Sequence, residues 1–73
     1  MTKMLKRLER IINNPKDVKW NEMVSLLKFL GFVCEKPSRG SHWSVYHPDS
    51  EEIIIVPVHQ NRVKPVYIKK LLR

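Results

Sequence analysis

The stretch that decides the fold is "FVCEKPSRGSHWSVYHPDSEEIIIVPVH", residues 32–59. It contains three short segments rich in β-branched and aromatic residues, at residues 32–36, 41–48 and 52–59, and turn residues separate them. Strands joined by connections this short pair with their neighbours in sequence. We therefore predict a three-stranded antiparallel sheet for this part of the chain.

Helical periodicity flanks the strand region on both sides. Residues 2–15 predict a first helix with Thr2 as N-cap, and residues 20–30 predict a second helix, which Gly31 ends. After the strands, Pro65 lies in the first turn of a last helix. The apolar residues at helical spacing are Leu5, Leu8 and Ile12, then Met23, Leu26, Leu27 and Leu30, and finally Ile68, Leu71 and Leu72.

The predicted order of elements is helix, helix, three strands and helix. Helices before and after a meander can cover only one of its faces, so we predict an α+β fold with one open sheet face. The start of the second helix has the weakest signal, because Lys19 is a poor N-cap. A length of 73 residues fits a single domain, residues 1–73, with a modest core.

The composition is that of a soluble globular domain, with 42% apolar and 29% charged residues. No apolar run approaches the roughly 18 residues of a membrane span, and no signal peptide opens the chain. The single Cys34 cannot form an internal disulfide, and we expect it to be a small buried apolar residue. These features predict a cytoplasmic protein without a membrane partner.

The charge is strongly positive. Fourteen Lys and Arg residues against seven Asp and Glu residues give a net charge of +7. Such a surface attracts polyanions, and nucleic acid is the commonest polyanion in a cytoplasm. A solvated basic surface, or one that meets an acidic protein, is the alternative explanation. The charge favours nucleic acid.

Alternation along the strands assigns their sides. Trp43 and Val45 form the natural inward pair of the second strand, so His42 points outward. If the even-numbered residues of the third strand face inward, paired positions sum to 99 or 101, and His42 lies opposite Pro57 or His59. In both registers His42 and His59 are direct or diagonal neighbours on the open face, with Cβ atoms roughly 5 to 8 Å apart.

Two neighbouring histidines suit the cleavage of RNA without a metal ion. The 2′-hydroxyl can attack the adjacent phosphorus if a base takes its proton and an acid protonates the leaving oxygen, and histidine titrates near neutrality. Gly40 would let a ribose-phosphate backbone approach closely, although a plain turn residue explains it more simply. Lone histidines in small proteins are also more often structural than catalytic. Cations flank the two strand ends, and we expect them to bind the RNA: Lys36, Arg39, Arg62 and Lys64.

Other kinds of site are poorly supported. Ser41 and His42 are adjacent on a strand and point to opposite faces, so they cannot form a nucleophile–base pair. His42 and His47 also face opposite ways, which argues against a shared metal site. The sequence has no cysteine pair for zinc, no glycine-rich phosphate loop and no carboxylate cluster for magnesium. We expect neither a metal ion nor a cofactor.

Four segments resemble one known family in order and spacing. They are "LLKFLGF" (residues 26–32), "GSHWSVYHP" (40–48), "VPVH" (56–59) and "KPVYIKKLL" (64–72). Over roughly residues 20–72 the chain resembles the HicA family, the small toxins of HicAB toxin–antitoxin modules. It departs from many members at Val66 and Tyr67, where they have a glycine and a small hydroxyl residue.

The resemblance implies a fold like the double-stranded-RNA-binding domain, with an extra N-terminal helix. It also implies an endoribonuclease that cleaves mRNA without needing a ribosome. The family's catalytic histidine falls on His42, and we assign supporting roles to Gly40, Ser41 and His59. The implied partner is a HicB-type antitoxin, which binds the toxin and masks the active site.

The third strand is apolar on both faces, although the helices can cover only one. Ile53 and Ile55 would therefore form an exposed apolar patch beside His42, and such patches often mark partner surfaces. We expect the antitoxin to cover them; the alternative is that the first helix, or that of a second copy, folds over them.

Two other functions compete with RNA cleavage. A non-catalytic RNA-binding module of the double-stranded-RNA-binding type would use its Lys and Arg residues on phosphates. A protein-binding adaptor would meet an acidic partner. The segment from Gly40 to His42, together with His59, favours the nuclease, because a passive binder would not need these residues.

Overall fold

The structure, a computed structural model, describes residues 2–72. These residues form three α-helices, one 3₁₀ turn and three strands, in the predicted order of helices and strands. The elements are α1 (Lys3–Asn13), η1 (Pro15–Asp17), α2 (Trp20–Phe29), β1 (Val33–Glu35), β2 (His42–Tyr46), β3 (Ile53–Pro57) and α3 (Pro65–Leu71). The α+β prediction is confirmed, whereas the 3₁₀ turn was not predicted.

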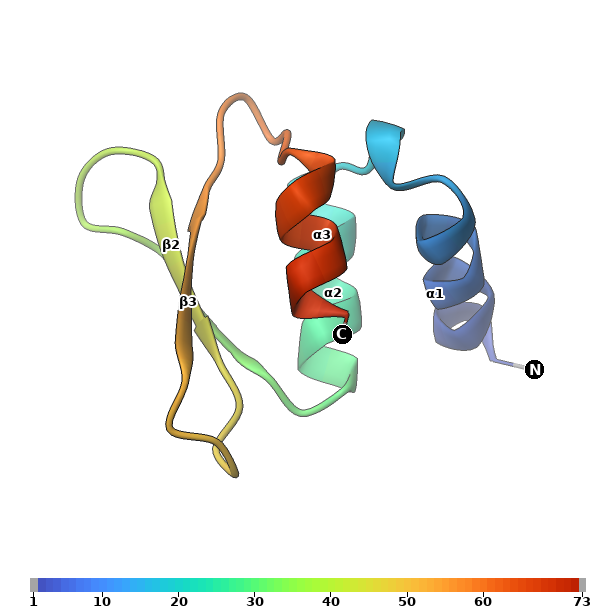
Figure 1. The fold of residues 1–73 in the computed structure, drawn as a ribbon, viewed down its shortest axis with the longest axis horizontal. Coiled ribbons are helices and arrows are strands. Elements are labelled where there is room, and N and C mark those ends of the chain that lie inside the picture. Colours follow the sequence, from blue (N-terminus) through green and yellow to red (C-terminus); the bar gives the residue numbers. More distant parts are fainter. Residues whose placement is uncertain (1, 73) are drawn as a thin grey trace.

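The elements lie in layers (Figure 1). The sheet forms one side, α2 and α3 pack on one of its faces, and α1 lies outermost, beyond α2 and α3. The other face of the sheet carries no helix among residues 2–72. This open antiparallel sheet with its helices on one side is consistent with an arrangement like that of the double-stranded-RNA-binding domain. None of the helices described for residues 2–72 is long and apolar enough to cross a membrane.

The strands pair antiparallel in the order β1-β2-β3, and their register confirms the predicted sides. His42 lies opposite Pro57, which is one of the two predicted registers. On the helix-covered side, Val45 and Val56 have no exposed surface. On the open side, Ile53 is 60% exposed and Ile55 is 49% exposed. The two faces therefore differ as the alternation predicts.

The core lies between the sheet and the helical layer. The ring of Trp20, at the start of α2, packs edge-on against Trp43 of β2, with centroids 5.6 Å apart. The buried apolar residues are Ile11, Val18, Trp20, Met23, Leu26, Leu27, Val45, Val56, Val63, Ile68 and Leu71.

The buried residue of α1 is not one of the apolar residues at helical spacing. Thr2 caps α1 as predicted, since its Oγ1 accepts the N–H of Leu5 at 3.2 Å. However, Leu5 is 42% exposed and Ile12 is 57% exposed, whereas Ile11 is fully buried. Because α1 is the outermost helix, only a narrow stripe of it meets the rest of the molecule (Figure 1).

Candidate functional site

His42 is the first residue of β2, and it is exposed on the open face of the sheet. Its Cα partner across the sheet is Pro57, the last residue of β3. Among residues 2–72, no side chain or backbone group forms a hydrogen bond with the His42 ring. Both ring nitrogens of His42 are therefore available to a ligand that lies on the open face.

His59 comes two residues after β3, diagonal to His42 in the register. Ladder pairing continues beyond β3, because the N–H of Val58 donates to the carbonyl of Ser41 at 2.8 Å. The exposed ring of His59 lies beside Ser41, with Nε2 of the ring 3.5 Å from the serine Oγ. The structure thus pairs Ser41 with His59, a contact that the sequence did not indicate.

A tight turn follows His59 and fixes its position. His59 and Arg62 exchange both backbone hydrogen bonds, at 3.1 and 2.9 Å. The two residues between them, Gln60 and Asn61, have φ angles of 52° and 63°, as a two-residue hairpin turn with left-handed central residues requires. Asparagine tolerates this conformation better than most residues.

Asn61 also caps α2, which explains how that helix begins without a good N-cap at Lys19. The carbonyl of Asn61 accepts the N–H of Trp20 at 2.7 Å, and its Oδ1 accepts the N–H of Asn21 at 2.9 Å. A further bond runs from Asn61 Nδ2 to Asn21 Oδ1 at 3.2 Å. The turn beside His59 is thereby held against the helical layer. This cap comes from 40 residues further along the chain, so local sequence patterns do not reveal it.

Gly40, two residues before His42, has a φ of +76°, which favours glycine. A Cβ at this position would meet no atom within 4 Å. The backbone conformation alone is therefore enough to account for the glycine, and the simpler explanation of Gly40 as a turn residue suffices. The space around Gly40 is open.

The four predicted RNA-binding cations lie at one end of the sheet. Lys36 and Arg39 are in the connection between β1 and β2, and Arg62 and Lys64 follow β3 (Figure 1). All four are exposed. Arg62 Nη1 lies 3.4 Å from an oxygen of Asp17, but both side chains are at least 70% exposed, so this ion pair is weak. The positive charge at this end of the sheet remains available to an anion.

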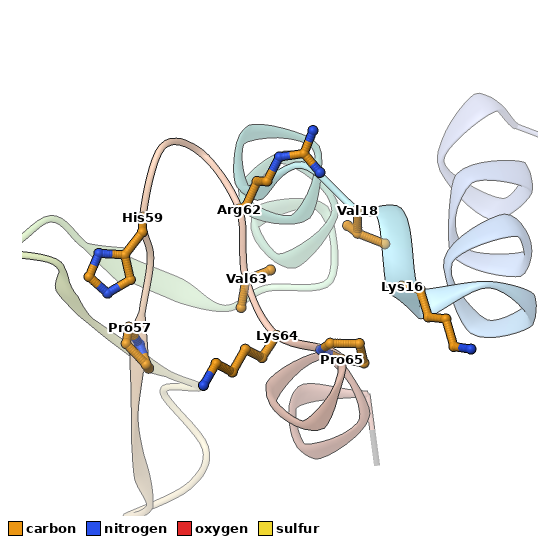
Figure 2. A pocket seen from close by; sticks show the side chains of 8 residues that line it. All are labelled: Lys16, Val18, Pro57, His59, Arg62, Val63, Lys64 and Pro65. Carbon is orange, nitrogen blue, oxygen red and sulfur yellow. The ribbon is translucent and has the colours of Figure 1, made fainter.

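A pocket of about 390 Å³ lies beside the end of β3 (Figure 2). Its apolar surface includes the buried residues Val18 and Val63. The Lys64 side chain extends toward Pro57, whereas Arg62 points away from it (Figure 2). The lining residues are Lys16, Val18, Pro57, His59, Arg62, Val63, Lys64 and Pro65. Lys16 and Val18 were not predicted as site residues, because sequence patterns did not indicate the 3₁₀ turn η1 that brings them here.

His47 differs from the other two histidines because it is held by the fold. Its ring packs edge-on against Phe32, with centroids 5.0 Å apart, and its Nδ1 accepts the N–H of Asp49 at 3.1 Å. A Cβ on Gly31, where φ is +94°, would lie 3.1 Å from the His47 ring. The arrangement indicates a structural role for His47.

Cys34 lies on β1 and packs against the core, and it is partly rather than fully buried. Burial raises the pKa of its thiol, and the positive charge of Lys28 opposes this shift. The thiol is thus a poor nucleophile at neutral pH. Among residues 2–72, no three His, Cys, Asp or Glu side chains are grouped so that they could hold a metal ion.

A comparison with known protein families finds a match over most of the chain. Residues 20–73 match the family described as HicA toxin of bacterial toxin-antitoxin. The matched region runs from the start of α2 to the end of the chain and includes His42, His59 and Lys64. Searches of the curated proteins and of the solved structures find no significant match.

Proposed function

The chain belongs to the HicA toxin family of bacterial toxin–antitoxin systems, and from this premise we propose that it is an endoribonuclease that cleaves mRNA without a metal ion. In this proposal His42 transfers a proton at the scissile phosphate, and the exposed cations at its end of the sheet hold the RNA. The observation that carries the proposal is the free His42 ring on the open sheet face, beside four exposed cations.

The chemistry needs only groups that RNA and this site supply. The ribose 2′-hydroxyl loses its proton to a base and attacks the adjacent phosphorus, and the 5′-oxygen of the next nucleotide leaves with a proton from an acid. The products are a 2′,3′-cyclic phosphate and a 5′-hydroxyl. One imidazole near neutrality can perform either proton transfer, which contributes roughly 10² to 10⁴ in rate. Nearby cations stabilise the charge that builds up on the phosphorus oxygens.

Expression without an antitoxin tests the proposal. Wild-type protein should arrest growth and degrade total mRNA, and His42→Ala should do neither. The matched control is His47→Asn, which removes the histidine on the other face but keeps an acceptor for the Asp49 N–H. It should remain active. Purified wild-type protein should cleave RNA equally well with and without EDTA. Equal growth and mRNA integrity with wild type and His42→Ala would instead indicate RNA binding without cleavage.

A toxin of such a module implies an antitoxin partner, and we propose that this partner is a HicB-type protein that covers Ile53 and Ile55. These two side chains are exposed on the same open face as His42, opposite Tyr46 and Ser44 of the neighbouring strand. The alternative that α1 folds over them does not hold in this structure, because α1 lies beyond the helical layer on the opposite side (Figure 1). An antitoxin on this patch would also block access to His42.

Replacing both Ile53 and Ile55 with Ser should weaken protection by the co-expressed antitoxin while RNA cleavage persists. Ile12→Ser is the control, since Ile12 is equally exposed but lies on the distant helix α1. It should leave protection unchanged. Full protection of the double variant would show that the antitoxin binds elsewhere, and loss of folding would show that the chain itself packs on these residues.

A further inference from the structure

We propose that the pocket beside the end of β3 binds one nucleotide of the RNA substrate, next to the nucleotide whose phosphate lies at His42. This inference rests on the proposed function and names a second subsite for the same substrate. Its phosphate would be held by Lys64, and its base would lie against His59 and the apolar wall of Val18 and Val63.

The size and surface of the pocket fit a nucleotide. Its volume of about 390 Å³ falls within the range of ligand pockets, roughly 300 to 1,000 Å³. Val18 and Val63 are at most 7% exposed, so they form a fixed apolar floor. The exposed imidazole of His59 offers a planar surface, and bases stack on such rings when RNA is bound as a single strand.

The charge of the pocket selects an anionic ligand. Lys16, Arg62 and Lys64 line it, and of the acidic residues described only Asp17 forms an ion pair with any of these three. Asp17 contacts Arg62, which points away from Pro57, whereas the Lys64 side chain crosses toward Pro57 (Figure 2). The Lys16 side chain also points away from Pro57 (Figure 2). Lys64 is therefore the cation that a phosphate near Pro57 would meet.

The position of the pocket connects it to His42. Pro57 lines the pocket and is also the direct cross-strand partner of His42, and the Cα atoms of such partners lie roughly 5 Å apart. A single strand of RNA with one phosphate at His42 could continue around the edge of β3 into the pocket. The His59 ring lines the pocket and lies beside Ser41, the residue that precedes His42.

Nucleotide binding can be tested apart from cleavage with His42→Ala protein, in which RNA remains intact. We expect AMP, GMP, CMP and UMP to shift the backbone amide signals of Val18, His59, Val63 and Lys64 in NMR spectra, and the matching nucleosides and inorganic phosphate to shift them less. Combined with His42→Ala, Lys64→Ala should weaken binding of a short single-stranded RNA about tenfold, and Lys64→Arg should restore most of it. His59→Ala should also weaken it about tenfold, because it removes the ring on which the base would stack.

The control is Lys6→Ala, an equal loss of charge on helix α1, which should leave RNA affinity nearly unchanged. With Lys64→Ala the slope of log affinity against log salt should fall by about 0.7, the value for one phosphate contact on a single strand. The proposal would be overturned if Lys64→Ala protein bound the RNA as tightly as Lys6→Ala protein does. A second contrary result would be an acidic peptide that shifts the amide signals of the pocket as strongly as the nucleotides do, while nucleosides shift none of them. The pocket would then be a protein-binding site.

The two proposals fail in different ways. If wild-type protein does not cleave RNA but nucleotides still shift the pocket amides, RNA cleavage is refuted and the nucleotide pocket stands. If wild-type protein cleaves RNA but no nucleotide shifts these amides, only the pocket proposal is refuted.

Discussion

The sheet of this toxin has two faces with opposite properties. On the face that α2 and α3 cover, Val45 and Val56 have no exposed surface, and their neighbours belong to the core. On the opposite face, Ile53 and Ile55 are about half exposed or more, and the exposed ring of His42 forms no hydrogen bond with any other residue described in the structure. The comparison indicates that the covered face supplies most of the stability, whereas the open face contributes little to it.

The largest expected effect is on the covered face. Val56→Ala should lower the free energy of unfolding by about 2–3 kcal/mol, because it removes two methyl groups from a site with no exposed surface and leaves a cavity. Urea unfolding of the wild type and the variant measures the loss. A loss below about 1 kcal/mol would mean that the helices do not close this face as tightly as the structure shows.

A slightly smaller effect on stability is expected at the turn of Gln60 and Asn61, which caps α2. Asn61→Ala should destabilise the protein by about 2 kcal/mol, since it removes the side chain that caps α2. Alanine also tolerates a φ of 63° less well than asparagine does. Asn61→Gly keeps the backbone conformation and should cost only about 1 kcal/mol.

Gln60→Gly is the matched control for the Asn61 variants. Gln60 has φ 52° but caps nothing, so this substitution should be neutral or slightly stabilising. Thermal unfolding of the three variants separates the cap from the backbone conformation. Equal stability of Asn61→Ala and the wild type would show that the Asn61 bonds do not support α2.

This contrast also shows why sequence patterns predict some features and miss others. Alternation along β2 and β3 was enough to predict that Val45 faces the core and Ile55 faces outward, because side chains on a strand alternate by geometry. The Asn61 cap could not be predicted in this way, since it joins residues 40 positions apart. For the same reason the pocket escaped prediction, because its walls come from η1 and from the segment after β3.

The candidate site was predicted in part by pattern and in part by resemblance. The register placed His42 opposite Pro57, and the exposure of His42 follows from alternation. Its role as the catalytic residue rests on the family resemblance and stays a proposal. On α1, helical spacing groups Ile12 with the other apolar residues, whereas Ile11 is the residue that is buried in the core. Spacing does not say which of two adjacent apolar residues meets the core.

The covered face can also be tested through Cys34, with a smaller effect on stability. Burial raises the pKa of this thiol from its ordinary value of 9.0. The folded protein therefore keeps the thiol proton at a pH where the unfolded chain loses it, and stability should decline as the pH rises through and above 9.0. Iodoacetamide at pH 8 should alkylate native protein several-fold more slowly than protein in urea. Equal rates would show that Cys34 is open to solvent.

The smallest effect on stability is expected at Ile55, which is adjacent to Val56 on β3. Ile55→Ala removes more apolar atoms than Val56→Ala, yet Ile55 is 49% exposed, so we expect a loss below about 1 kcal/mol in the same urea experiment. Exposure, rather than side-chain size, then decides the order of the two variants. If Ile55→Ala destabilised the free toxin as much as Val56→Ala, Ile55 would be buried in solution, by a second copy or by another segment. The open face would then not be free for an antitoxin, and the comparison of the two faces would fail.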